Sequence, residues 1–588
     1  MRRVFLIFVF LIQSLNQSES FTSEFELRRE KILKFYVDSV QLGKDKVDFF
    51  ILTAKIKFSK EVKILLPYLD SLIQNPGIGD MFFAYQLIGL YLHCKENLPF
   101  EYRDKIKNVF KTRTIYRGDT ENHWLMYYVA WYLISQEWEN EIWSNLKTSS
   151  ENFREASEYI NYWVDGTTSF GQMEFDSPTY IITFVPPLCL LYDFAQDTLM
   201  KKMAQMMLEY ILFDYAVEYL KGCYCGAHSR DYPELAVNPI QAQSQAIGYL
   251  YFGETEFDPR SMRKNAVIFC ALSKFQLPDV IRYIATDRQF PYEHKERKRV
   301  RNVIRYGRER NPAVYKYTYM TRNYCVGSLQ GGILQPIQQH SWDITFSNGL
   351  TIFSVHPYFS EIELGMFFPE EVKILPELVD RAHKVYRSPD KWTSSSPYER
   401  IFQYRGSLIV LYGLFEMVEG EKYRHVNIFI PRGVDRFEID TVGWVIGKVE
   451  NGYFGIRVLG GVYELKLEET CYRFRVYGDK ICLIIEVGDS DEFGDFDRFR
   501  EGLKSSEVDF DFDIFEVRYK GIRGFEMRFG YFGDRYVDGV EYKLNWGLFD
   551  GRFARSDLKS KVIEINYKGK KRVLNFNKLT IEETQAIQ

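Results

Sequence analysis

Cysteine is scarce in this chain, which has eight cysteines among 588 residues. Cys223 and Cys225 form a C-x-C pair, unlike the C-x-x-C spacing of zinc or redox sites. The other six lie singly among apolar or aromatic neighbours, as small core residues do: Cys94, Cys189, Cys270, Cys325, Cys471 and Cys482. This spacing argues against a disulfide scaffold.

An excess of one charge sign is also lacking, because 76 Lys and Arg stand against 80 Asp and Glu. This balance argues against a general nucleic-acid binder, so we expect no nucleic-acid partner. One local exception is residues 294–310, HKERKRVRNVIRYGRER, with eight Lys or Arg against two Glu. This segment is either a basic surface for a polyanion or a solvated linker and first strand.

Long apolar runs are absent beyond the N-terminus, so we expect no membrane span in the mature chain. The first twenty residues are MRRVFLIFVFLIQSLNQSES, with two arginines, the apolar run Val4 to Ile12, and small residues near Ser20. This pattern is typical of a secretory signal peptide. We therefore expect residues 1–20 to be removed after Ser20, and the protein to be secreted or periplasmic.

The hydrophobic pattern changes near residue 300. Residues 21–295 repeat apolar positions at three- and four-residue spacing, which favours helical hairpins stacked as an α/α array. Residues 296–588 contain short runs rich in β-branched and aromatic residues, punctuated by Gly, Asn and Asp. We predict an α+β protein in separate domains, with an N-terminal α/α toroid of helical hairpins and C-terminal antiparallel β-sandwich layers.

The standard motifs H-E-x-x-H, G-x-S-x-G, the phosphate loop and the dinucleotide fingerprint are absent from the sequence. Aromatic residues are abundant instead, at 17% of the chain. Five of the nine tryptophans fall within 40 residues: Trp124, Trp131, Trp138, Trp143 and Trp163. Such rings fill cores, but they also stack on sugars.

Two segments of the helical half carry polar residues at expected helix starts. In ENHWLMYYVAWYLISQEW, residues 121–138, Asn122 and His123 begin the helix, and Thr120 or Asn122 is its expected cap. In EFDSPTY, residues 174–180, Asp176 or Ser177 is the expected cap, and Tyr180 falls in the first turn. If alternate helices run the same way, both first turns open at one end of the bundle. The alternative for the first segment is core packing.

Two further polar segments carry histidines. The first is GAHSRDYPE, residues 226–234, with His228, Arg230 and Tyr232 at alternate positions. The second is QGGILQPIQQHSWDITF, residues 330–346, in which Gln338, Gln339 and His340 precede a strand. The alternatives are a capped interhelical loop and a polar strand edge.

These residue types suit β-elimination across a uronic-acid unit. Asn, Gln, His or Arg can donate hydrogen bonds to the carboxylate as its charge grows, while Tyr or His moves the proton. The reaction needs no metal or organic cofactor, although a structural calcium or zinc ion stays open. Glycoside hydrolysis instead needs two carboxylates, for which Glu121 and Glu174 are the candidates.

The helical half, the antiparallel β half, and Asn122-His123 followed by Tyr180 resemble polysaccharide lyases of the heparinase II/III and alginate-lyase type. Chondroitin and hyaluronan lyases share this broad architecture. The resemblance implies catalytic roles for six residues: Asn122 and His123 as neutralisers, Tyr180 as proton donor, His228 or His340 as base, and Arg230 as orienting cation. Residues that adjoin them are expected to contact substrate: Trp124, Tyr127, Glu174, Tyr232, Gln338 and Gln339.

We therefore expect an enzyme, a secreted polysaccharide lyase that acts on an acidic polysaccharide such as a glycosaminoglycan or alginate. Two alternatives stay open at this point. One is an α/α-barrel glycoside hydrolase with paired carboxylates, and the other is a non-catalytic polysaccharide-binding protein of the same fold.

Overall fold

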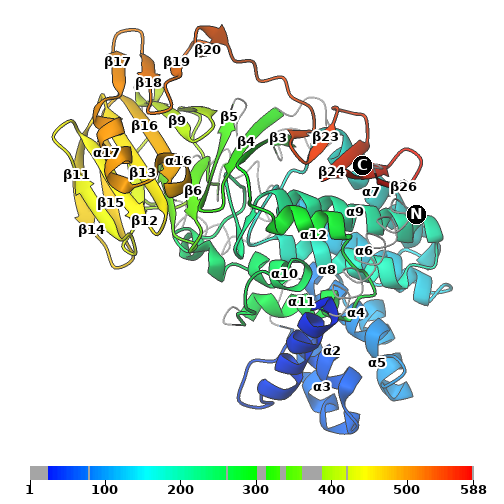
Figure 1. Cartoon of the computed structure of the whole chain (residues 1–588). Coiled ribbons are helices and arrows are strands. Elements are labelled where there is room, and N and C mark those ends of the chain that lie inside the picture. Colours follow the sequence, from blue (N-terminus) through cyan, green and yellow to red (C-terminus); the bar gives the residue numbers. More distant parts are fainter. Residues whose placement is uncertain are drawn as a thin grey trace, which may run out of the picture. The chain divides into compact units, whose positions relative to one another are not determined.

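The computed structural model describes residues 24–76, 80–259, 262–300, 313–330, 339–359, 387–418 and 421–585. The expected signal peptide and Gln338 lie outside these residues. The described chain is helical in its N-terminal part and rich in antiparallel sheet in its C-terminal part, as predicted (Figure 1). No helix in the described ranges is long and apolar enough to cross a membrane.

The chain divides into two compact units. The helical unit comprises Met1–Val164, Tyr180–Ala216 and Gln243–Ile284, and the sheet unit comprises Asp165–Thr179, Val217–Ala242 and Ala285–Gln588. The two inserted segments of the sheet unit lie between helices in the sequence. They contain residues 174–179 of one polar segment singled out from the sequence, and the whole of another, residues 226–234.

The helices follow the three- and four-residue apolar spacing. Residues 24–34 are helical, and the longer helices are α2 (Phe49–Phe58), α3 (Leu66–Gln74), α4 (Asp80–Cys94), α5 (Phe100–Thr112), α6 (Glu121–Glu137), α7 (Ser149–Phe170), α8 (Ile181–Phe194), α9 (Thr198–Val217), α10 (Ser244–Tyr251), α11 (Val267–Leu272) and α12 (Asp279–Thr286). Helix α6 starts where expected, because the side chain of Thr120 accepts a hydrogen bond from His123 N at 3.3 Å.

The expected start of α8 is wrong by several residues. Its N-cap residue is Tyr180, which makes no side-chain capping bond, and the helix begins at Ile181. Asp176 has a positive φ of 50°, which takes the backbone out of the helical region. Its carboxylate binds lysines instead of capping the helix, as described below.

Helices α6 and α8 pack side by side and run in the same direction. At their C-terminal ends, Gln136 Nε2 donates to Phe194 O at 2.9 Å. At their N-terminal ends, Trp163 links the two helices. Its Nε1 donates to Glu121 Oε1 at 3.0 Å, and its ring stacks on Phe184 at 6.2 Å. The first turns of both helices therefore lie at one end of the pair.

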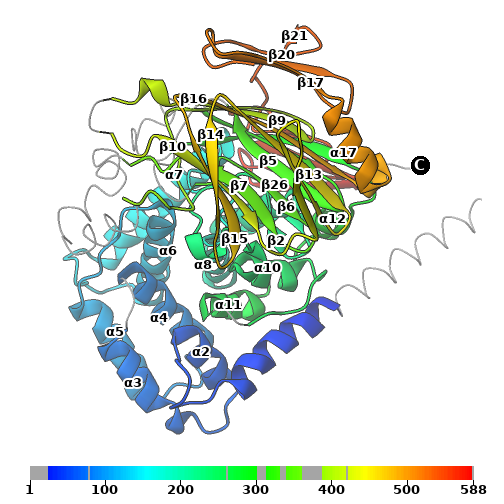
Figure 2. The same cartoon turned by 90° about the vertical axis from the view of Figure 1, so that its left-hand side faces the viewer.

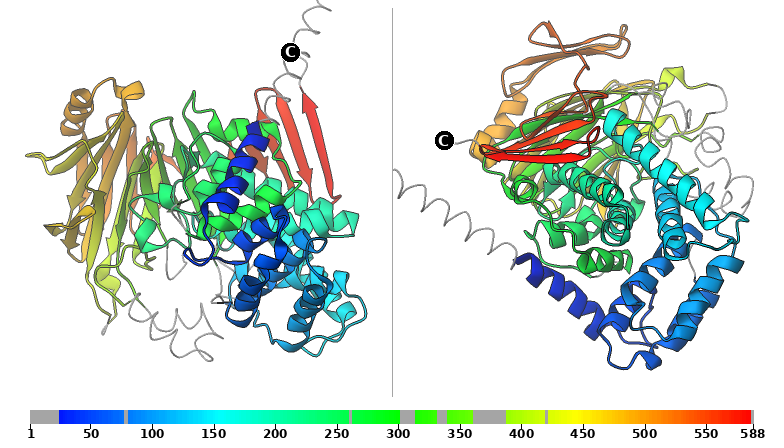
Figure 3. Two further views of the ribbon diagram at one scale, coloured as in Figure 1. Left: turned by 90° about the horizontal axis from the view of Figure 1, so that it is seen from below. Right: turned by 90° about the vertical axis from the view of Figure 1, so that its right-hand side faces the viewer.

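The largest sheet has 13 strands with antiparallel pairings throughout. Its strand order is β14 (Val462–Leu467), β15 (Cys471–Tyr477), β10 (His425–Pro431), β7 (Thr351–Val355), β6 (Trp342–Phe346), β5 (Tyr324–Gln330), β4 (Ala313–Met320), β3 (Tyr292–Arg299), β22 (Phe549–Gly551), β23 (Ala554–Ser556), β24 (Val562–Tyr567), β25 (Lys570–Asn575) and β26 (Thr580–Gln585). Figure 2 shows β5, β6 and β7 side by side, and the C-terminal strands at one edge are red in Figure 3.

Three smaller sheets lie in the described part of the sheet unit. One is a six-stranded sheet in the order β11 (Arg436–Ile439), β12 (Trp444–Val449), β13 (Gly452–Leu459), β16 (Lys480–Asp489), β9 (Ser407–Gly413) and β8 (Glu399–Tyr404). Another runs in the order β17 (Glu507–Asp511), β18 (Glu516–Lys520), β19 (Glu526–Gly530), β20 (Arg535–Val537) and β21 (Val540–Glu541). The two-stranded ribbon pairs β1 (Tyr219–Leu220) with β2 (Cys223–Tyr224), and short helices α16 (Ser490–Phe493) and α17 (Phe496–Lys504) follow β16.

The six-stranded sheet is buried on both faces, as strand β9 shows. Leu408 and Val410 pack in one apolar cluster with Val326 and Ile344 of the large sheet. The intervening Ile409 packs in a different cluster, with residues of β18, β19 and α17. Because successive side chains of a strand point to opposite faces, one apolar run serves two cores.

Over its described part, the basic segment near residue 300 forms a strand, as one of the two alternatives expected, but it is not a solvated linker. Residues Tyr292–Arg299 form β3, whose His294, Glu296 and Lys298 side chains are buried. Lys298 and Arg299 bond to partners inside the protein, so neither presents a free cation to a polyanion. Residues 301–312 lie outside the described ranges.

Candidate functional site

Two histidines from distant parts of the sequence meet in the sheet unit. His228 N donates to His340 O at 3.2 Å, and His340 N donates to His228 O at 3.0 Å. The two rings lie 5.0 Å apart, and both residues are at most 2% exposed. These two backbone hydrogen bonds join the loop that contains His228 to the segment that leads into β6.

Glycines allow the His228 loop to lie against the large sheet. Gly327 pairs with Asp343 across β5 and β6. A Cβ on Gly327 would lie 2.7 Å from Gly226 Cα, closer than atoms approach in proteins. The missing side chain therefore brings the loop, and His228 with it, next to Asp343.

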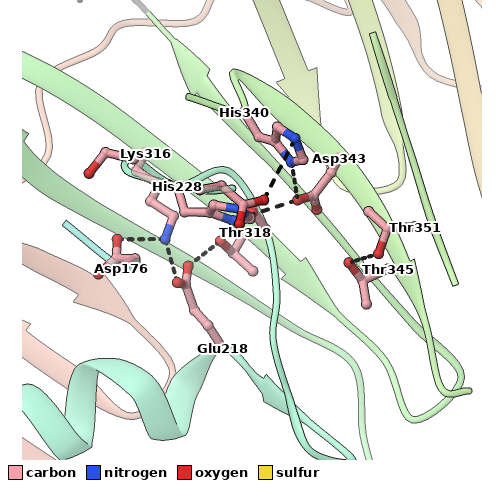
Figure 4. A network of polar contacts seen from close by, with 12 residues as sticks. Asp176, Glu218, His228, Lys316, Thr318, His340, Asp343, Thr345 and Thr351 are labelled. Carbon is pink, nitrogen blue, oxygen red and sulfur yellow. Dashed lines mark hydrogen bonds and ion pairs between the residues drawn. The ribbon is translucent and has the colours of Figure 1, made fainter. Parts of the chain in front are cut away.

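Two carboxylates face the histidine pair (Figure 4). Asp231 Oδ2 lies 3.1 Å from His228 Nε2 and 3.8 Å from His340 Nε2. Asp343 Oδ2 lies 3.7 Å from His228 Nδ1 and 3.8 Å from His340 Nδ1. All four residues are buried. We call His228, Asp231, His340 and Asp343 the histidine cluster.

The charge state of His228 follows from its neighbours. Burial disfavours the imidazolium, but the Asp231 hydrogen bond, the charges of Asp231 and Asp343, and the Gly226 carbonyl outweigh this, so the pKa of His228 is raised. For Asp231, burial is outweighed by the hydrogen bond and charge of His228, so the pKa of that carboxyl is lowered. Both shifts favour an ion pair between the His228 imidazolium and the Asp231 carboxylate.

The histidine cluster has the ligand atoms to hold a divalent cation in place of the proton between His228 and Asp231. Ligand atoms of His228, Asp231 and His340 all lie within 4.8 Å of one another. Neither ring nitrogen of His340 and neither carboxylate oxygen of Asp343 has a hydrogen-bond partner in the described chain. Imidazole nitrogens with a carboxylate are a donor set that suits zinc and related metals.

A second buried charge network adjoins this cluster (Figure 4). Lys316 Nζ lies 2.6 Å from Asp176 Oδ2, 3.4 Å from Glu296 Oε1, and also bonds Glu218. Lys298 Nζ lies 2.8 Å from Asp176 Oδ1 and 2.9 Å from Glu296 Oε2. These five residues are almost completely buried, and we call them the lysine network.

Local structure explains how these residues meet. Glu296 and Lys316 are directly paired across β3 and β4. Glu218 precedes the β1–β2 ribbon, whose turn residues Lys221 and Gly222 have positive φ values of 46° and 98°. The lysine network has three carboxylates and two lysines. Burial, together with the charges of Glu296 and Asp176, outweighs the Lys316 charge and raises the pKa of Glu218 to about 8.

The other predicted residues of the sheet unit already have partners. Arg230 Nε lies 3.1 Å from Glu174 Oε1, and both side chains are buried. Tyr232 N donates to Asp231 Oδ1 at 2.8 Å. Gln339 Nε2 donates to Ser341 Oγ at 3.1 Å. Glu174 and Arg230 thus neutralise each other within one buried ion pair.

The remaining predicted residues lie in the helical unit. Asn122 is buried, with Nδ2 donating to Thr120 Oγ1 at 2.9 Å, and the His123 ring meets Phe82 edge-on at 5.4 Å. Tyr180 is 8% exposed at the start of α8. Asn122, His123 and Tyr180 therefore share one end of the parallel pair α6 and α8.

Trp124 and Tyr127, the aromatic residues expected to contact substrate, pack against other side chains of the protein. Arg117 Cζ lies 3.7 Å from the Trp124 ring centroid, and Trp124 Nε1 donates to Gly118 O at 2.7 Å. Tyr127 packs edge-on against Tyr128 and Trp131. Glu121, a carboxylate of the hydrolase alternative, accepts the Trp163 bond described above.

Sequence reasoning missed the lysine network and both aspartates of the histidine cluster. One signal was present: in YEHKERKR, Glu296 and Lys298 stand two residues apart, and every second residue from Tyr292 to Lys298 is buried. Acids and bases at a spacing of two place complementary charges on one face of a strand. No protein-family model matches the chain, and a search of curated proteins finds no significant relative.

Proposed function

We propose that this protein is an exported polysaccharide lyase that cleaves a uronate-containing polysaccharide by β-elimination. The helical unit would be an incomplete α/α toroid, and the large and six-stranded sheets would form β-sandwich layers. The observation that carries the proposal is the parallel packing of α6 and α8, which brings Asn122, His123 and Tyr180 to one end of a helix pair.

Asn122 and His123 neutralise the uronate in this scheme. The proton to be removed is weakly acidic and sits on the carbon that bears the carboxylate. When it leaves, negative charge moves onto the carboxylate oxygens. Hydrogen bonds from the Asn122 amide and the His123 ring stabilise that charge more in the transition state than in the bound substrate.

Tyr180 moves the proton. Its phenolate oxygen takes the proton from the carbon beside the carboxylate, and the bond from the neighbouring carbon to the glycosidic oxygen breaks. A double bond forms between the two carbons, and the departing oxygen takes a proton from the tyrosine hydroxyl. We assign no base role to His228 or His340, because both face the carboxylates of the histidine cluster.

The test is a panel of uronate polymers incubated with the purified full-length protein. We expect an increase in ultraviolet absorbance from the unsaturated uronate, and its loss in Tyr180→Phe with substrate binding retained. Tyr192→Phe is the matched control, because Tyr192 lies at the other end of α8. Near-full activity of Tyr180→Phe contradicts the proposal.

The same panel separates the alternatives. New reducing ends without the absorbance would favour a hydrolase, for which Glu121 and Glu174 are the carboxylates to replace. Binding with neither product would favour a polysaccharide-binding protein.

A further inference from the structure

A cavity of about 490 Å³ lies in the sheet unit, and its lining includes Gln339 and Ser341 on either side of His340 in the sequence. Strand β8, the segments around Ser395 and Phe532, and strands β19 and β20 contribute to its wall. The residues that matter here are Arg400, Arg535, Ser395, Ser396, Tyr531 and Phe532. We call this cavity the arginine pocket.

Arg400 and Arg535 have no ion pair with a carboxylate in the described chain. Arg400 Nη1 donates to Pro397 O at 2.7 Å and to Glu399 O at 2.8 Å. Arg535 Nη2 donates to Ile401 O at 3.2 Å, and its buried Nε has no partner. Because a guanidinium has five N–H donors, both arginines keep donors for a ligand.

Aromatic rings hold both guanidinium groups. Arg400 Cζ lies 4.9 Å from the Tyr531 ring centroid, and Arg535 Cζ lies 4.9 Å from that of Phe529. Tyr531 is itself fixed, because its hydroxyl donates to Glu416 Oε2 at 2.6 Å. Stacking on a ring restricts the plane of a guanidinium and so reduces the entropy lost when it binds an oxyanion.

The two arginine charges lie close enough to affect each other. Burial and the nearby Arg400 charge together lower the pKa of Arg535 to about 10, which shows that the two cations repel each other. Glu399 is the acidic residue that lines the pocket, and its carboxylate accepts a hydrogen bond from Tyr412 at 2.6 Å. It makes no ion pair with either arginine.

We propose that Arg400 and Arg535 bind the carboxylate or sulfate group of an acidic sugar unit. The guanidinium donors fit an oxyanion, and Ser395 and Ser396 line the same cavity. Phe532, which is 73% exposed and also lines the pocket, provides a face for the sugar ring. The choice of an acidic sugar rests on the proposed function, but binding here involves no cleavage.

The experiment is calorimetric titration of the full-length protein with D-glucuronate, inorganic sulfate and, as a neutral control, D-glucose. We expect glucuronate and sulfate to bind and glucose not to. Arg400→Gln and Arg535→Gln should each weaken both anions about 10-fold, the effect of losing a charge-assisted hydrogen bond. Phe532→Ala should weaken glucuronate alone.

The matched control is Arg528→Gln. Arg528 lies on β19 and stacks on Tyr536 at 4.0 Å, but it does not line the pocket. Unchanged affinity in Arg400→Gln, or equal loss in Arg528→Gln, overturns the proposal. If Arg535→Gln does not fold, Arg400→Gln and the exposed Phe532→Ala decide. Binding of sulfate without glucuronate would make this an inorganic oxyanion site and overturn the sugar assignment.

These outcomes are independent of turnover. If glucuronate binds through Arg400 while Tyr180→Phe keeps full activity, the lyase proposal fails and the arginine pocket stands. If Tyr180→Phe is inactive while the arginine variants bind normally, the reverse holds.

Discussion

His228 and His340 exchange both backbone hydrogen bonds, at 3.2 and 3.0 Å, and their rings lie 5.0 Å apart. This bridge places Asp231 and Asp343 on either side of the ring pair. Four buried groups that can bind a proton or a cation thereby share one small volume.

We expect the histidine cluster to bind a divalent metal. Adding one equivalent of Zn²⁺ to chelator-treated protein should raise the Tm, because a ligand that binds only the native state stabilises it. His340→Gln should remove this increase, measured by differential scanning calorimetry. His356→Gln is the control, since His356 is also buried but bonds to Ser396 and Tyr423. No increase in the wild type, or the same loss in both variants, contradicts the expectation.

We expect Lys316→Met to destabilise the protein by about 3–5 kcal/mol, because it leaves buried carboxylates without their cation. The midpoint of urea unfolding measures this effect. Adding Glu296→Gln to the variant should restore part of the loss, since one buried carboxylate left without the Lys316 cation disappears. Lys295→Met on β3 is the control, as its side chain is 24% exposed. A Lys316→Met protein as stable as that control would contradict the role of the lysine network.

The raised pKa of Glu399 predicts that the stability of the fold depends on pH. Burial raises its pKa to about 7, despite hydrogen bonds from Ser341 and Tyr412 and the charge of Arg400. A carboxyl whose folded pKa is raised stabilises the fold fully below its unfolded pKa of about 4.3, and this contribution is lost as pH rises through about 7.

Glu399→Gln should therefore flatten the decline in stability between about pH 5 and pH 8 relative to the wild type. Thermal unfolding across that range measures the difference. Glu450→Gln, at an exposed position, should follow the wild-type curve. Parallel curves for wild type and Glu399→Gln would mean that Glu399 does not titrate in this window.

Asn122→Ala should reduce kcat about 10²–10³-fold, the usual effect of losing one donor to a developing oxyanion. The assay is the ultraviolet absorbance of the unsaturated product. Gln136→Ala is the control, because Gln136 lies at the opposite end of α6 and bonds Phe194. Equal losses in both variants would indicate that the helix pair, and not the amide, matters.

The amino-acid sequence by itself determined the order in which helices and strands follow one another along the chain. Apolar spacing of three and four residues in α3 and α5, and short runs of β-branched and aromatic residues in β9 and β10, are local properties that each segment carries alone. The cap at Thr120 was predictable for the same reason, since its hydrogen bond spans three residues. The start of α8 was not predictable, because the Asp176 carboxylate pairs with Lys298 and Lys316 and does not cap the helix.

Only the tertiary structure decided which polar residues share a site. His228 and His340 were recognised as separate candidates, but their pairing depends on Gly327 lacking a side chain under the His228 loop. The lysine network depends on the β3–β4 register and on two segments inserted between helices. Long-range electrostatic pairing leaves almost no local sequence pattern. A charged residue whose partner is distant in the sequence has the same local pattern as a charged residue exposed to solvent.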